Sequence, residues 1–134
     1  MRDIDFRAWD KITKRMMLVV SISFKRNREL LQYLLNGGDP NDYNLARRDA
    51  EDAILLQYTG LKDKNGRKVY EGDIVHYCSE DIDVVSEIGF DESLLAYVMY
   101  SWEGNYIFGY EPSSVFEVIG NIYENPELVE DLKK

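Results

Sequence analysis

The chain has one cysteine and one histidine among its 134 residues, and each scarcity excludes a class of protein. Because Cys78 has no second cysteine to pair with, an intrachain disulfide is impossible, which fits a reducing cytoplasm. His76 and Cys78 alone cannot complete a typical zinc site, since structural zinc takes four ligands and catalytic zinc usually takes three from the protein. The sequence therefore predicts no metal and no cofactor.

Long hydrophobic runs are also lacking. A membrane helix needs about 20 consecutive apolar residues, and the longest candidate, Met16–Ser23, is far shorter. The acidic start, with Asp3 and Asp5, does not resemble a secretory signal. We therefore expect no membrane contact and a cytoplasmic location. Hydrophobic residues still make up 45% of the chain, which is enough to bury a core and argues against disorder.

Recognisable catalytic motifs are absent as well. Gly37-Gly38 is followed by Asp39-Pro40, not by the lysine and helix of a phosphate-binding loop, and no serine nucleophile elbow occurs. Strand alternation places His76 and Cys78 on one face, with Asp81 and Asp83 nearby. Side chains two residues apart on a strand lie about 6–7 Å from each other, too far for a Cys–His nucleophilic pair.

Two carboxylates, Glu71 and Asp73, flank Gly72 and resemble a pair for metal or acid–base chemistry. The same Glu-Gly-Asp sequence is typical of a corner that opens a strand, where the aspartate bonds to backbone amides. An enzyme that uses Glu71, Asp73 and His76 is thus the least favoured hypothesis, and we expect no enzymatic activity.

Basic residues are scarce in the second half of the chain. Residues 1–70 hold 14 Lys and Arg against 10 Asp and Glu, a net charge of +4, whereas residues 71–134 hold 2 against 15, a net charge of −13. The acidic half disfavours direct nucleic-acid binding, because phosphate contacts supply most nonspecific affinity. Opposite halves of two copies could attract each other in a head-to-tail contact. The plainer alternative is that the charges only solvate the surface.

The first part of the sequence alternates between strand and helix patterns. A hairpin is predicted from about Asp3 to Phe24, because apolar residues alternate with polar ones on either side of a polar turn. Leucines in Asn27–Leu35 form a helical stripe that ends at the Gly-Pro-rich stretch 36–40. A second short helix, capped by Asp42 or Asn44, is predicted to follow. The insertion at 25–53 is therefore expected to be helical and variable.

The remainder has a β pattern. A strand at 54–58 leads into five short strands between about 73 and 123, which together suggest a small closed barrel. Pro126 begins a closing helix over 127–132. The predicted fold is mainly β (α+β), with an N-terminal hairpin and helical insertion in residues 1–58 and a small β-barrel with its closing helix in residues 59–134.

Four segments carry a family resemblance: DFRAWD at Asp5–Asp10, QYTGLKDKNG at Gln57–Gly66, VYEGDIV at Val69–Val75 and GNIYENPEL at Gly120–Leu128. In this order they resemble the YopX family of bacteriophages and prophages. The motif positions, which we expect to be structural, are Tyr58, Gly60, Asp63, Asn65, Gly66, Tyr70, Glu71, Gly72, Asp73, Gly120, Asn121, Tyr123, Asn125 and Pro126.

The resemblance implies an SH3-like barrel in the C-terminal part, self-association and an accessory role in the cytoplasm of a bacterial host. It implies no activity, cofactor or catalytic residue. Residues 25–53 and 79–115 carry none of the matching motifs.

Aromatic residues crowd the predicted hairpin that precedes the last strand. They include the candidate interaction surface Tyr97, Tyr100, Trp102, Tyr106 and Tyr110. Tyrosine and tryptophan supply rigid amphipathic contact area and are enriched at interfaces. We therefore expect a non-enzymatic, oligomeric protein-interaction module that binds copies of itself or an unknown host or phage protein. The alternative is an acidic DNA mimic or regulator that acts on a host DNA-binding protein.

Overall fold

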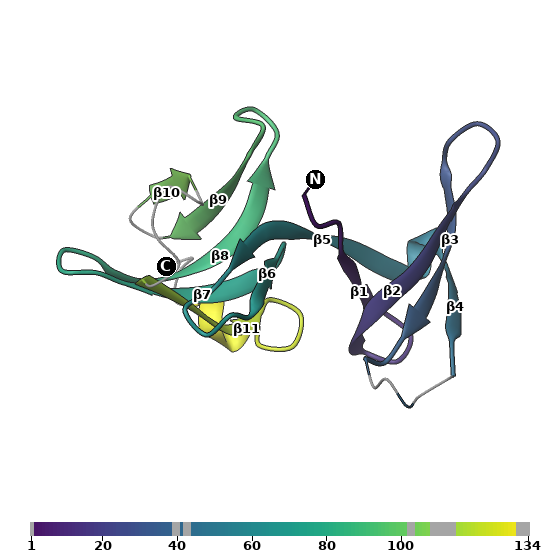
Figure 1. Cartoon of the computed structure of the whole chain (residues 1–134), viewed down its shortest axis with the longest axis horizontal. Helices are drawn as coiled ribbons and strands as arrows, with labels where there is room; N and C mark the ends of the chain where they lie inside the picture. The colour runs from purple at the N-terminus through teal and green to yellow at the C-terminus, as the bar shows by residue number, and fades with distance from the viewer. Residues whose placement is uncertain (1, 39–40, 42–43, 102–103, 108–114, 131–134) are drawn as a thin grey trace. The chain divides into compact units, whose positions relative to one another are not determined.

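The computed structural model describes residues 2–38, 41, 44–101, 104–107 and 115–130, and within these it is mainly β. The chain divides into two compact units. One consists of Ile4–Gln57, and the other of Met1–Asp3 with Tyr58–Lys134. The division after Gln57 lies next to the boundary at 58/59 that the sequence indicates. We call them the N-terminal and C-terminal units and describe each separately (Figure 1).

The N-terminal unit is an antiparallel sheet in the order β4-β3-β2-β1-β5. Its strands are β1 (Phe6–Asp10), β2 (Arg15–Phe24), β3 (Leu30–Asn36), β4 (Ala46–Asp49) and the first half of β5 (Ala53–Lys62). The predicted hairpin is confirmed, with Ala8 opposite Met17. One face of the sheet buries the core of this unit, which comprises Ala8, Met17, Tyr33, Leu35 and Ala53.

The predicted helical insertion is wrong. The leucine-rich segment forms β3, which pairs with β2 on one side and β4 on the other. Tyr33 and Leu35 are buried on one face, whereas Leu34 and Gln32 lie on the other. Doubled leucines satisfy both a helical and a strand period, and pairing on both edges decides between them. The predicted second helix is likewise wrong, because β4 and a single 3₁₀ turn at Ala50–Asp52 occupy its place.

The C-terminal unit contains the predicted five strands between 73 and 123. They are β7 (Asp73–Cys78), β8 (Asp83–Asp91), β9 (Ala96–Ser101), β10 (Gly104–Ile107) and β11 (Phe116–Asn121), in the order β10-β9-β8-β7-β11 (Figure 1). The second half of β5 pairs with β6 (Lys68–Tyr70). No pairing between the outer strands β10 and β11 occurs among the described residues. The closed SH3-like barrel therefore stays a prediction.

The register of β7, β8 and β9 divides their side chains between two faces. The core face carries buried residues from every strand, namely Val75, Tyr77, Val84, Ile88 and Met99. The outer face carries Ile74, His76 and Cys78 from β7 with Asp83 and Glu87 from β8 and Tyr100 from β9. The short helix α1 (Glu127–Glu130) contacts β8 and gives the predicted closing helix its first turn. No helix in the described part of the chain is long and apolar enough to cross a membrane.

Candidate functional site

The turn at residues 63–66 is attached to the last strand by one buried carboxylate. Asp63 Oδ1 accepts hydrogen bonds from the amides of Asn65 and Arg67, both at 2.9 Å. Asp63 Oδ2 accepts the amide of Val118 in β11, also at 2.9 Å. Burial alone would raise the pKa of Asp63, but these amides lower it below its ordinary value of 3.8. Gly66 completes the turn with a φ of +79°, which glycine adopts without strain.

The second corner joins the other two motif segments. Asp73 is buried, and its Oδ2 accepts the amide of Tyr70 at 2.8 Å. Gly72 donates its amide to the carbonyl of Ile88 and accepts the amide of Ile122. Asp73 and His76 lie an odd number of residues apart on β7, so their side chains leave opposite faces of the strand. Asp73 and His76 therefore cannot act together in the acid–base group of Glu71, Asp73 and His76 that the sequence suggested.

The Gly120–Leu128 segment forms a turn built by two asparagines. Asn121 Oδ1 accepts the amides of Tyr123 and Glu124, and Asn125 Oδ1 accepts the amide of Asn121. A Cβ on Gly120 would lie 2.5 Å from Asn125 Oδ1, so only glycine fits beside this side chain. The turn places Pro126 directly before α1, and α1 lies over the outer face of the sheet.

The described tyrosines of the candidate interaction surface do not form one patch. Tyr97 packs against the core and makes an edge-to-face contact with Phe90, with 5.3 Å between ring centroids. Tyr106 pairs with Met99 on the same side and is exposed, whereas Tyr100 lies on the outer face. Trp102 and Tyr110 lie outside the described residues. Tyr100 is therefore separated from the other described tyrosines of the set by the sheet itself.

A cavity of about 450 Å³ lies on the outer face beside Tyr100. Its walls combine apolar side chains with two carboxylates and are formed by Glu87, Tyr100, Ser101, Ile122, Pro126, Val129 and Glu130. Gly89 makes room for the Tyr100 ring, because a Cβ there would lie 2.4 Å from Cε2. Burial, followed by the nearby Asp91 and Glu87 carboxylates, raises the pKa of the Tyr100 hydroxyl, so it stays a neutral donor. We call this the acidic cavity.

The β2–β3 turn of the N-terminal unit has the opposite character. Lys25, Arg26 and Arg28 are all exposed, as is the neighbouring Phe24. The Arg28 guanidinium lies 5.1 Å from the centre of the Phe24 ring, a cation–π contact. Two backbone bonds, from Lys25 to Glu29 at 2.7 Å and from Arg28 to Lys25 at 2.9 Å, fix the turn. We call residues 24–28 the basic tip.

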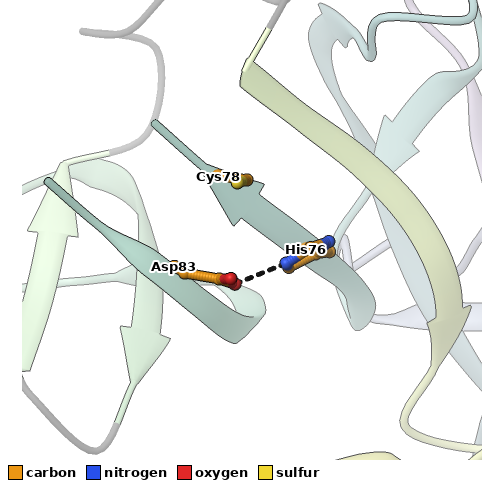
Figure 2. A group of neighbouring side chains, drawn as sticks. All are labelled: His76, Cys78 and Asp83. Atoms are coloured by element: carbon orange, nitrogen blue, oxygen red, sulfur yellow. Dashed lines mark hydrogen bonds and ion pairs between the residues drawn. The ribbon is translucent and has the colours of Figure 1, made fainter. Parts of the chain in front are cut away.

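Three potential metal ligands meet on the outer face beside the loop that connects β7 to β8 (Figure 2). His76 Nε2 lies 2.6 Å from Asp83 Oδ1, and the ligand atoms of His76, Cys78 and Asp83 all lie within 4.8 Å of one another. The sequence placed Asp83 near His76 and Cys78 but predicted no metal site there, because it counted only the histidine and the cysteine as zinc ligands. Asp81, the other carboxylate expected nearby, is not in the group.

The chain matches a known protein family over most of its length. A family model described as YopX protein matches residues 5–130, nearly the whole chain. The chain belongs to the YopX family. Similar solved structures include a crystal structure of protein EF1440 from Enterococcus faecalis, with 26% identity and a TM-score of 0.69. That alignment covers 97% of this chain and 100% of the other.

Protein yopX from Bacillus subtilis has the same fold, with 24% identity, a TM-score of 0.65, and coverage of 97% of this chain and 100% of that one. None of the curated proteins matches the chain. Three of the four YopX segments meet in the C-terminal unit, where the turns containing Asp63, Gly72 and Asn121 connect to one another and to β11. The His76–Cys78–Asp83 group lies outside all four segments.

Proposed function

We propose that this YopX protein is a non-enzymatic interaction module that assembles head to tail with copies of itself. The acidic cavity of one copy receives the basic tip of the next. The observation that carries the proposal is the complementarity of these two surfaces within one sequence. One surface has two carboxylates beside apolar walls. The other has three cations beside an aromatic ring, of which Lys25 pairs with the neighbouring Glu29 at 3.8 Å and Arg26 and Arg28 carry the remaining positive charge.

The acidic cavity suits a long cationic side chain. The exposed Glu130 at its rim can accept charge-assisted hydrogen bonds from a guanidinium, which binds carboxylates with two parallel bonds, and Glu87 on the sheet adds negative charge to the same cavity. The walls formed by Ile122, Pro126 and Val129 can cover the aliphatic stem of an arginine or the edge of an aromatic ring. About 450 Å³ lies in the range of ordinary ligand pockets, about 300–1,000 Å³.

The basic tip is suited to insertion because it is already ordered. Its backbone hydrogen bonds and the Arg28–Phe24 contact hold the turn in shape, which reduces the entropy lost on binding. Phe24 has 48% of its surface exposed, and such an aromatic gains most by burial in a partner.

The two surfaces differ, so the contact is heterologous. Such contacts build rings if the rotation between copies closes and filaments if it does not. Attraction between an acidic and a basic surface weakens as salt rises, because exposed charges are screened. Assembly is therefore salt-dependent.

The biological setting belongs to the same proposal. The YopX resemblance supports an accessory role for a bacteriophage or prophage in the cytoplasm of a bacterial host. An assembling module without enzymatic activity would act there by occupying or organising other proteins.

A charge-swap experiment tests the contact. Arg26→Glu in the basic tip and Glu130→Arg in the acidic cavity each place like charges together, so each should shift the mass measured by light scattering toward one chain. The doubly swapped chain recreates an opposite pair and should assemble again.

The controls carry the same charge changes at exposed positions away from both surfaces. Arg47→Glu and Glu92→Arg should assemble as the original chain does. If the double swap fails to restore assembly, or if the control variants are equally impaired, the head-to-tail contact is wrong. If none of the four single changes alters the measured mass, the head-to-tail contact is also wrong. The chain would then associate through another surface or bind a host protein instead.

A further inference from the structure

A thiol, an imidazole and a carboxylate converge where β7 and β8 turn back on each other. Figure 2 shows the Asp83 carboxylate directed at the His76 ring, with Cys78 farther along the same strand as His76. The His76–Asp83 distance is 2.6 Å, and all three ligand atoms lie within 4.8 Å of one another. Cys78 and Asp83 are exposed and His76 is partly exposed, so an ion in solution has access.

The sheet itself fixes the positions of the three residues. Cys78 and Asp83 are direct cross-strand partners, and His76 lies two residues earlier on the same face of β7. The Ser79 amide closes the connecting loop by donating to the Ile82 carbonyl at 2.7 Å. The backbone therefore holds the three donors together before any ion arrives, which lowers the ordering cost of binding.

We propose that His76, Cys78 and Asp83 form a binding site for Zn²⁺ within a single chain. A nitrogen, a sulfur and an oxygen donor together match the ligand set of zinc, whereas Mg²⁺ and Ca²⁺ prefer oxygen alone. A thiolate and a carboxylate carry two negative charges, which neutralise the ion. The net charge of −13 over residues 71–134 also attracts a cation to this unit.

The distances are within reach of coordination. Zinc bonds of about 2.0–2.3 Å in a tetrahedron separate neighbouring donors by about 3.3–3.8 Å. The His76–Asp83 pair at 2.6 Å must open to this separation, and donors up to 4.8 Å apart must approach to it; rotation of the exposed Cys78 and Asp83 side chains allows both. On binding, Cys78 loses its thiol proton to solvent and a zinc–sulfur bond forms. His76 binds the ion through the Nε2 lone pair, with the ring hydrogen on Nδ1 and any further ring proton released to solvent, and Asp83 binds as the carboxylate.

Three protein ligands leave one tetrahedral position for water or for a donor from a bound molecule. Glu117 lies across from His76 on β11, but its carboxylate pairs with Lys64 at 3.3 Å and accepts a hydrogen bond from the side-chain Nδ2 of Asn65 at 3.1 Å. It is therefore directed at the 63–66 turn, and the residues that the structure describes supply three protein ligands to the site.

Cobalt substitution followed by zinc titration tests the site on the full chain. Co²⁺ should produce a thiolate-to-cobalt charge-transfer band at one equivalent per chain, and added Zn²⁺ should remove it. His76→Gln, Cys78→Ser and Asp83→Asn should each weaken Zn²⁺ binding in calorimetry more than about tenfold, since even outer-shell changes cost that much. Asp81→Asn removes an exposed carboxylate from the same hairpin and should bind as the original chain does.

The three ligand positions are partly or fully exposed, so these variants should keep the original circular dichroism spectrum. Absence of the charge-transfer band would overturn the proposal. So would equal weakening by Asp81→Asn, or a stoichiometry of one ion per two chains accompanied by metal-dependent dimerisation. The last result would mean that exposed cysteines of two copies share the metal.

Discussion

Replacement of Asp63 by asparagine changes only one oxygen to an NH₂ group, yet it should clearly lower the free energy of unfolding of the C-terminal unit. The new side chain keeps one oxygen for the amides of Asn65 and Arg67 but presents an NH₂ group to the amide of Val118, which now bonds at 2.9 Å. Two donors then face each other in a buried place. A hydrogen bond to a charged group contributes about 1.5–3 kcal/mol, and the orphaned Val118 amide adds a penalty, so we expect a loss of about 2–4 kcal/mol.

Urea unfolding followed by circular dichroism measures this loss, with Asp81→Asn as the control. That exposed aspartate undergoes the same change of charge, and surface changes of this kind usually stay within about 0.5 kcal/mol. If Asp63→Asn and Asp81→Asn unfold at the same urea concentration, Asp63 does not attach the turn to β11.

The pH dependence provides a second check on the same carboxylate. Because the folded pKa of Asp63 is lowered, its contribution is complete above the unfolded pKa, about 3.9, and is lost as pH falls through the lower folded value. The stability difference between the original chain and Asp63→Asn should therefore be largest near neutral pH and should shrink below about pH 4. A difference that is constant with pH would contradict the assignment.

Two further substitutions have defined outcomes. Gly89→Ala places a Cβ 2.4 Å from the present position of Tyr100 Cε2, so this ring, which forms part of the wall of the acidic cavity, must shift, and light scattering should show weaker assembly. If assembly is unchanged, Tyr100 does not take part in the head-to-tail contact. Arg48→Ala removes the partner of the fully buried Asp10, bound at 2.8 Å, and should lower the free energy of unfolding by about 2–3 kcal/mol in a urea titration. A loss below about 0.5 kcal/mol would show that Asp10 is stabilised by its other partners.

Local turn chemistry explains why much of the C-terminal unit is predictable from sequence. Asp63, Asn65 and Gly66 build their turn with contacts among near neighbours, so the residue types alone indicate it. Strand alternation likewise predicts the five strands between 73 and 123. The segment that became β3 was not predictable in the same way, because its strand state depends on β2 and β4, which only the folded chain brings alongside.

The candidate sites show a similar division. Alternation places His76 and Cys78 on one face, but the third ligand follows from the register that sets Asp83 opposite Cys78. Tyr97 and Tyr100 are three residues apart on one strand, so alternation already separates them onto different faces. The acidic cavity depends on α1 lying over the outer face, which no local pattern specifies.

The most direct test of head-to-tail assembly is the mass of the original chain in solution at two salt concentrations. Light scattering after size-exclusion chromatography, with a chelator present to remove metal, compares a buffer of 0.01 M salt with one of 1 M, where the screening length falls from about 30 Å to about 3 Å. We expect a multiple of the 15.7 kDa chain mass at low salt and a shift toward a single chain at high salt. A strict monomer in both buffers would contradict the proposed function.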